Sequence, residues 1–184
     1  MFLVGFMGAG KTSVGRALGK QLNWLFEDLD ARIERREGRT VPDIFRECGE
    51  AGFRHAEHMA LQEALEELRG GASKVLALGG GAFVQRNNAD LLKKSGAPTV
   101  FLDAPVEELW QRCLRQASEA GAERPLLRSP EQFRELYQAR KKIYQRASLT
   151  VSTSARTVDE ISAEIAERLA LKKVEMRLGK GEVE

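Results

Sequence analysis

The sequence has little that would suggest a disulfide framework, a membrane span or a nucleic-acid surface. Only two cysteines occur among 184 residues, Cys48 and Cys113, and two distant thiols outside metal-binding spacings are typical of a reduced, cytoplasmic protein. No apolar run approaches the roughly 20 residues of a membrane span, and the first apolar residues lead directly into a glycine-rich loop without the regions of a signal peptide. The net charge of +2 is too small to favour nucleic acid or an anionic membrane as a partner. We therefore expect a cytoplasmic protein with neither partner.

Short apolar runs alternate with longer segments of helical periodicity. The apolar runs predict five strands, at 1–6, 23–30, 74–81, 98–103 and 148–153. The periodic segments predict helices at 11–22, 31–37, 40–48, 50–69, 87–95, 105–118, 130–146 and 157–172. This alternation is typical of βαβ units, so we expect an α/β fold with a five-stranded parallel sheet between layers of helices. The length fits a single domain over residues 1–172, and the charged segment 173–184 has the composition of a frayed tail.

The stretch GFMGAGKT at residues 5–12 matches the phosphate-loop pattern G-x-x-x-x-G-K-[ST]. An apolar strand precedes it and a periodic helix follows it, which is the context that the pattern requires. Backbone N–H groups of such a loop surround an anion, and the helix N-terminus adds partial positive charge. We expect Lys11 to reach the β- and γ-phosphates of a nucleoside triphosphate and Thr12 to ligate Mg²⁺. The residues predicted to hold the nucleotide here are Gly8, Ala9, Gly10, Lys11, Thr12 and Ser13.

Two acids follow the second apolar run, in the stretch FEDLD. Asp28 and Asp30 are two residues apart and would share a face at the end of a strand, where ligands bind in an open α/β sheet. There they could hold Mg²⁺ or accept a proton from a hydroxyl group. They could equally form a solvated turn in which Asp30 caps the next helix, and spacing alone leaves both interpretations open. Glu27, on the alternate face, is predicted to be an ordinary surface residue.

The segment EAGFRHAEH carries Arg54 and Glu57 three residues apart, so that they can meet on one helix face. An arginine held by an acid suits a carboxylate ligand, although a plain surface ion pair fits the spacing as well. His55 and His58 lack a third ligand nearby, and we interpret them as surface or packing residues.

Three further features complete the candidate site. Gly79, Gly80 and Gly81 follow an apolar run and allow a ligand to approach the backbone closely. The stretch QASEAGAERP contains few apolar anchors and carries Arg124, which suits a flap that brings charge to a phosphoryl group. Arg112 precedes this flap and could lie over a base, and the basic segment 140–146 could direct one cation inward.

Five blocks together resemble the shikimate kinase family: GFMGAGKTSVGR, FEDLDARIERREG, GEAGFRHAEH, LALGGGAFV and ERPLL. The resemblance implies transfer of the γ-phosphoryl group of ATP to the 3-hydroxyl of shikimate, on the route to chorismate. It also implies a fold like that of the nucleoside-monophosphate kinases, with substrate-binding helices at 31–61 and a mobile lid at 112–126. A kinase of another hydroxy acid, such as gluconate, and a nucleotide-binding domain without catalysis are the alternatives.

On the acceptor side, the resemblance implies that Asp30 binds the hydroxyls as base or orienter. Arg54 and Arg140 would hold the carboxylate, with Glu57 orienting Arg54, and Gly79–Gly81 would line the substrate.

On the nucleotide side, the resemblance assigns Lys11 and Arg124 to the phosphates, Thr12 and Asp28 to Mg²⁺ and its water shell, and Arg112 to the adenine. No residue is assigned in the loop near 152–158. A monomer that takes shikimate and ATP is expected.

Overall fold

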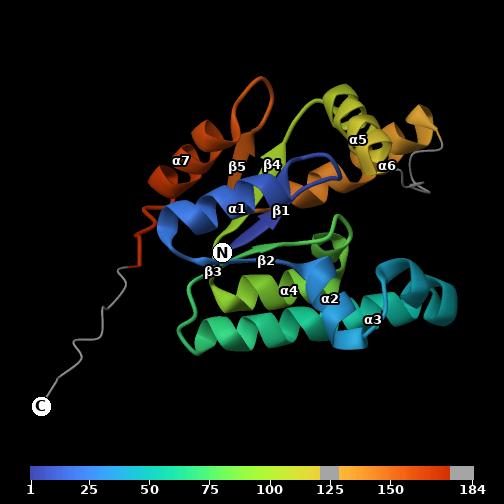
Figure 1. Ribbon diagram of the computed structural model, residues 1–184, viewed down its shortest axis with the longest axis horizontal. Coiled ribbons are helices and arrows are strands. Elements are labelled where there is room, and N and C mark those ends of the chain that lie inside the picture. The colour runs from blue at the N-terminus through green and yellow to red at the C-terminus, as the bar shows by residue number, and fades with distance from the viewer. Residues whose placement is uncertain (121–128, 175–184) are drawn as a thin grey trace, which may run out of the picture.

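A computed structural model describes residues 1–120 and 129–174 (Figure 1). The strands are β1 (Phe2–Val4), β2 (Leu25–Asp28), β3 (Lys74–Ala77), β4 (Thr99–Asp103) and β5 (Leu149–Ser152). The helices are α1 (Lys11–Leu22), α2 (Leu29–Glu37), α3 (Val41–Arg69), the 3₁₀ turn η1 (Ala82–Val84), α4 (Arg86–Ser95), α5 (Val106–Ala120), α6 (Pro130–Tyr144) and α7 (Val158–Arg168).

The five strands form one parallel sheet in the order β2-β3-β1-β4-β5. The central strand β1 pairs on both sides, with Phe2 opposite Leu76 of β3 and Thr99 of β4. Its residues are all buried, as expected of a strand covered by helices on both faces. Helices α1 and α7 lie together on one side of the sheet, and α3 and α4 lie on the other (Figure 1). The predicted fold class is confirmed.

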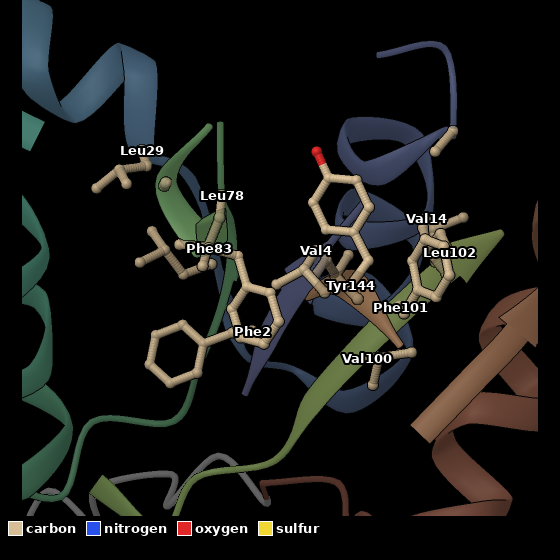
Figure 2. Close-up of a cluster of buried hydrophobic side chains, with 14 of the residues drawn as sticks. Phe2, Val4, Val14, Leu29, Leu78, Phe83, Val100, Phe101, Leu102 and Tyr144 are labelled. Carbon is tan, nitrogen blue, oxygen red and sulfur yellow. The ribbon is translucent and has the colours of Figure 1, made fainter. Parts of the chain in front are cut away.

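Aromatic side chains fill the centre of the core. Figure 2 shows Phe2 and Phe101 from neighbouring strands beside Tyr144, which the end of α6 inserts between the helices and the sheet. The rings of Phe101 and Tyr144 stack with their centroids 5.4 Å apart. The core thereby fixes the end of α6, which belongs to the candidate site.

One element boundary differs from the sequence prediction in a way that matters for the site. Strand β2 ends at Asp28 and not at residue 30, because the Asp28 side chain accepts the backbone N–H of Asp30 and starts α2. The two helices predicted at 40–48 and 50–69 are confirmed: α3 spans both, and the non-helical Gly49 between them (φ 66°, ψ −173°) separates them by a kink.

The end of the described chain runs beside the end of α1. The backbone N–H of Val174 donates to the Leu22 carbonyl at 2.9 Å, and the Trp24 indole donates to the Lys172 carbonyl at 3.2 Å. A frayed tail was predicted at 173–184, and its residues from 175 onwards lie outside the described residues. Over the part of the chain described here, no helix is long and apolar enough to cross a membrane.

Candidate active site

The phosphate loop joins β1 to α1 at the carboxyl edge of the sheet. Gly5, Gly8 and Gly10 all have positive φ, at 144°, 78° and 89°. At Gly8 a Cβ atom would lie 2.7 Å from the Leu109 carbonyl oxygen and 2.9 Å from Cys113 Sγ, so only glycine fits. Gly10 caps α1 without a side-chain hydrogen bond, and the first N–H groups of the helix are therefore available to an anion.

Backbone carbonyls of the phosphate loop hold the Lys11 side chain in place. The Lys11 Nζ donates to the carbonyls of Gly5 and Phe6, both at 2.9 Å. Burial lowers the pKa of Lys11 to about 8, and the nearby Asp30 and Asp28 carboxylates oppose that shift. The two carboxylates therefore offset only part of the cost of burying the ammonium group. A bound phosphate would add further negative charge beside it.

The two acids lie beside the loop, but not as the strand spacing suggested. Thr12 Oγ1 donates to Asp28 Oδ2 at 3.2 Å, and Asp28, not Asp30, is the N-cap of α2. The prediction of Asp30 as a cap is therefore wrong, and so is its placement on a strand: it lies in the first turn of α2. Thr12 and Asp28 supply the hard oxygen ligands that Mg²⁺ prefers.

Asp30 has the features of a reactive carboxylate. Its Oδ1 is buried and has no hydrogen-bond partner among the described residues. Burial is the largest cause that raises the pKa of Asp30, and repulsion from Asp28 raises it further. Lys11 opposes the increase. Asp30 lines a cavity of about 250 Å³ with the phosphate loop, Gly79 and Gly80. Asp30 is therefore placed where a hydroxyl group in this cavity could meet both its carboxylate and the phosphates.

Arg54 and Glu57 form a fixed pair and not a surface ion pair. Arg54 Nη1 donates to the two Glu57 carboxylate oxygens at 3.1 and 3.0 Å, and the Glu57 side chain is only 1% exposed. Burial raises the pKa of Glu57, with Arg54 opposing the change. The Phe53 ring lies 5.1 Å from the guanidinium. These contacts fix the direction of Arg54.

The glycine loop brings the acceptor residues together. A Cβ at Gly79 would lie 2.8 Å from Asp30 Oδ1, and a Cβ at Gly81 would lie 2.6 Å from Arg54 Nη1. The Gly80 carbonyl accepts a hydrogen bond from Arg140 Nη1 at 3.4 Å and another from the Tyr144 hydroxyl. The loop thus contacts side chains from α2, α3 and α6, and the sequence analysis assigned no role to Tyr144.

On the other side of the phosphate loop, Arg112 joins the loop to the end of the sheet. Its Nη1 donates to Thr153 Oγ1 at 3.0 Å and to the Gly8 carbonyl at 3.4 Å, and its Nη2 donates to the Thr153 carbonyl at 2.8 Å. Arg112 lines a cavity of about 410 Å³ with Ser13, Thr153 and Arg156. Neither Thr153 nor Arg156 was predicted from the sequence. Both lie just after the last strand, where ligands bind in such sheets, and that position could have indicated them.

Two predicted features stand apart from this geometry. Arg124 and residues 121–126 of the predicted lid lie outside the described residues. His58 Nδ1 lies 2.7 Å from Asn88 Oδ1, which fits a packing histidine, and the described residues contain no group of three or more His, Cys, Asp or Glu that could hold a metal.

The fold and the site define a phosphate-loop kinase with an acceptor pocket suited to a small hydroxy acid. A family model described as Shikimate kinase matches residues 7–170. The chain is 44% identical over 170 residues to a shikimate kinase from Thermus thermophilus, covering 91% of this chain and 88% of that one. It is 37% identical over 170 residues to shikimate kinase from Persephonella marina, covering 92% and 98%.

Solved structures agree with these relatives. The shikimate kinase from Acinetobacter baumannii in complex with shikimate has a TM-score of 0.81 at 36% identity, covering 95% of this chain and 94% of that one. A gluconokinase from Sinorhizobium meliloti has a TM-score of 0.53 at 21% identity, which reflects a shared fold alone. The chain belongs to the shikimate kinase family, whose members are ATP-dependent phosphotransferases that act on a hydroxyl group of shikimate.

Proposed function

We propose that this chain transfers the γ-phosphoryl group of ATP to the 3-hydroxyl of shikimate, and that the residues described above carry out the transfer. The observation that supports this best is the glycine loop, which contacts Asp30, Arg54 and Arg140 beside the phosphate loop. A carboxylate held by the two arginines would direct its ring hydroxyls towards Asp30.

On the nucleotide side, the phosphates bind to the backbone N–H groups at the start of α1 and to Lys11. Arg112, Thr153 and Ser13 line the pocket that receives the nucleoside. When bound, Mg²⁺ supplies charge neutralisation between the phosphates. Thr12 would hold it directly and Asp28 through its water shell, since the Thr12 hydroxyl and the Asp28 carboxylate lie 3.2 Å apart. Arg124 is proposed to contact the phosphates from the lid.

On the acceptor side, Arg54 and Arg140 bind the carboxylate. Asp30 accepts a hydrogen bond from the attacking hydroxyl and takes or directs its proton. Its raised pKa follows first from burial and then from the nearby Asp28, and its carboxylate lines the cavity beside the phosphate loop, as this role needs. Most of the rate enhancement then comes from positioning and charge neutralisation.

We also infer a cytoplasmic monomer. Its exposed large apolar side chains in the described part are scattered over five positions on different segments: Leu25, Phe45, Leu114, Val158 and Val174. Single exposed apolar residues of this kind are ordinary on monomeric proteins. The cysteines Cys48 and Cys113 form no disulfide with each other, as is usual in reducing compartments.

The decisive experiment is a coupled assay of ADP release against a panel of hydroxy acids that includes shikimate and gluconate. We expect turnover with shikimate, and Arg54→Ala should raise its KM strongly with little change in the KM for ATP. Phosphorylation of gluconate and not of shikimate would refute the proposal, and so would ATP binding without turnover on any acid.

A further inference from the structure

A cavity of about 760 Å³ lies between η1, α4 and the end of α6, and reaches Thr99 at the start of β4. It shares no lining residue with the phosphate-loop cavity or with the cavity that contains Arg112. It shares Arg86 with a third cavity, of about 340 Å³, which Arg54 also lines. Pockets that hold small organic ligands typically measure about 300–1,000 Å³.

Three cations and one acid line this cavity: Arg86, Lys93, Arg146 and Asp90. None of these four side chains forms an ion pair or hydrogen bond with another residue in the described part of the chain. Arg86 and Lys93 are seven residues apart on α4, so they lie on one helix face about 10.5 Å apart along its axis. The wall therefore carries more positive than negative charge, on exposed side chains that are not paired with one another.

The position of Arg86 argues for a ligand. Lys93 lies in the last turn of α4, where a cation interacts favourably with the helix dipole. Arg86 is the first residue of α4, where a cation is unfavourable, and the next acid along the helix is Asp90, four residues further, which forms no ion pair with it. An anion beside Arg86 would remove this repulsion.

The floor of the cavity is apolar. Val84 of η1 and Ile143 of α6 are half-buried and present apolar surface to the cavity, above the buried Phe83 and Leu92. The hydroxyls of Thr99 and Ser148 also line the cavity, but they lie 3.2 Å apart and are engaged with each other. The recognising groups are therefore an apolar floor and arginine forks, which suit carboxylates.

We propose that this cavity is a second ligand site, which binds a small organic carboxylate with an apolar ring. The ring packs on Val84 and Ile143, and the carboxylate binds Arg86 or Arg146.

The same site is coupled to the acceptor side of the active site, and this part rests on the proposed function. Phe83 follows the glycine loop, separated from Gly81 by one residue. Ile143 precedes Tyr144, whose hydroxyl donates to the Gly80 carbonyl. A ligand that contacts η1 and α6 together stabilises the arrangement that holds the glycine loop, so it should lower the KM for shikimate.

The binding test uses 2-naphthoate, with 2-naphthamide as its uncharged counterpart. Calorimetric titrations of the full chain, with ADP and shikimate saturating the active site, should show binding of one 2-naphthoate. The amide should bind about tenfold more weakly. Arg86→Gln/Arg146→Gln should lower the affinity for 2-naphthoate about tenfold or more.

The matched control is Lys94→Gln/Lys142→Gln, which removes the same charge from residues that lie outside the cavity lining. This pair should bind 2-naphthoate like the wild type. Absence of saturable binding, an unchanged affinity in the arginine pair, or an equal loss in the lysine pair would overturn the site. Arg146 lies outside the acceptor site, whereas Arg86 also lines a cavity that contains Arg54. Because the titrations are made with shikimate and ADP already bound, a loss of 2-naphthoate binding is measured separately from a failure of shikimate binding.

The coupling has its own readout. Saturating 2-naphthoate should lower the KM for shikimate about fivefold in the wild type and leave it unchanged in Arg86→Gln/Arg146→Gln. Binding without any change in this KM would refute the coupling, and an equal change in both proteins would assign the effect to the active site.

Discussion

Replacing Gly81 by alanine should disable the carboxylate site without touching the phosphate loop. Gly81 has φ −97° and ψ −20°, so alanine is compatible with the backbone there. The added Cβ would lie 2.6 and 2.7 Å from the two terminal nitrogens of Arg54 and 3.0 Å from its Cζ. The substitution therefore acts on the guanidinium and not on the loop conformation.

The size of the effect follows from these distances. To restore an ordinary contact of 3.4 Å from 2.6 Å, the Arg54 nitrogen must move by 3.4 − 2.6, about 0.8 Å. The same nitrogen donates to Glu57 at 3.0 and 3.1 Å, so the displaced guanidinium loses either that pairing or its alignment with the ligand. A hydrogen bond to a charged group contributes about 1.5–3 kcal/mol, which corresponds to a rise in the KM for shikimate of about 10- to 150-fold.

The assay is steady-state kinetics on a double-mutant cycle. Gly81→Ala should raise the KM for shikimate in the wild-type background and leave the KM for ATP unchanged. In the Arg54→Ala background the same substitution should change little, because the group it displaces is already absent. Additive effects of Gly81→Ala and Arg54→Ala would refute the reasoning, since they would mean that the new methyl group acts on the substrate directly.

The remaining predictions concern the phosphate side and the reacting carboxylate. Because burial lowers the pKa of Lys11 to about 8 from 10.5, the unfolded chain binds more protons between these values, so the free energy of unfolding of the free protein should rise with pH over this interval. Urea unfolding should show this rise in the wild type and not in Lys11→Met, and an identical pH dependence in both would contradict it. Over the same interval ATP affinity, measured by calorimetry, should fall as Lys11 loses its proton; a constant affinity would show that Lys11 does not bind phosphate as a cation. Asp30→Asn should lower kcat about 10²- to 10⁴-fold with a smaller effect on KM, whereas wild-type turnover would reduce Asp30 to a structural role. Chelation of Mg²⁺ should abolish transfer, and Asp28→Asn should raise the Mg²⁺ concentration needed for half-maximal rate; an unchanged requirement would remove Asp28 from the metal site.

The two acids after β2 illustrate where prediction from sequence was limited. The sequence identified Asp28 and Asp30 as candidate site residues, and the structure places both beside the phosphate loop. The predicted place of Asp30 on the strand was wrong. Its backbone N–H donates to the Asp28 side chain, and the strand ends two residues earlier than predicted. A periodicity of two cannot show where a strand gives way to a helix, because the capping side chain decides it.

Glu27 shows the same limit in another form. It was predicted to be an ordinary surface residue, but its side chain is only 11% exposed and it pairs with Lys74 at 2.8 Å and with Arg32 at 3.1 Å. Lys74 is 47 residues away along the chain. Only the pairing of β2 with β3 brings the two together, and no local pattern contains that information.

The pair of Arg54 and Glu57 could be predicted from the sequence only in part. The spacing of Arg54 and Glu57 allowed an ion pair on one helix face, and the structure contains that pair. Spacing could not distinguish a solvated pair from a buried one, because burial depends on the elements that cover α3. The resemblance to the family selected Arg140, and the structure places it within hydrogen-bonding distance of the Gly80 carbonyl.

The phosphate loop and the alternation of strands and helices could be predicted from the amino-acid sequence alone, and the parallel sheet follows from that alternation. These features depend on residues close together in the chain: glycines with positive φ, a lysine and threonine at a helix start, and apolar residues at fixed periods. Only the tertiary structure decided which side chains meet across the site, such as Gly81 with Arg54 and Arg112 with Thr153. Those contacts join segments that are distant in sequence, and their geometry follows from how the helices pack on the sheet.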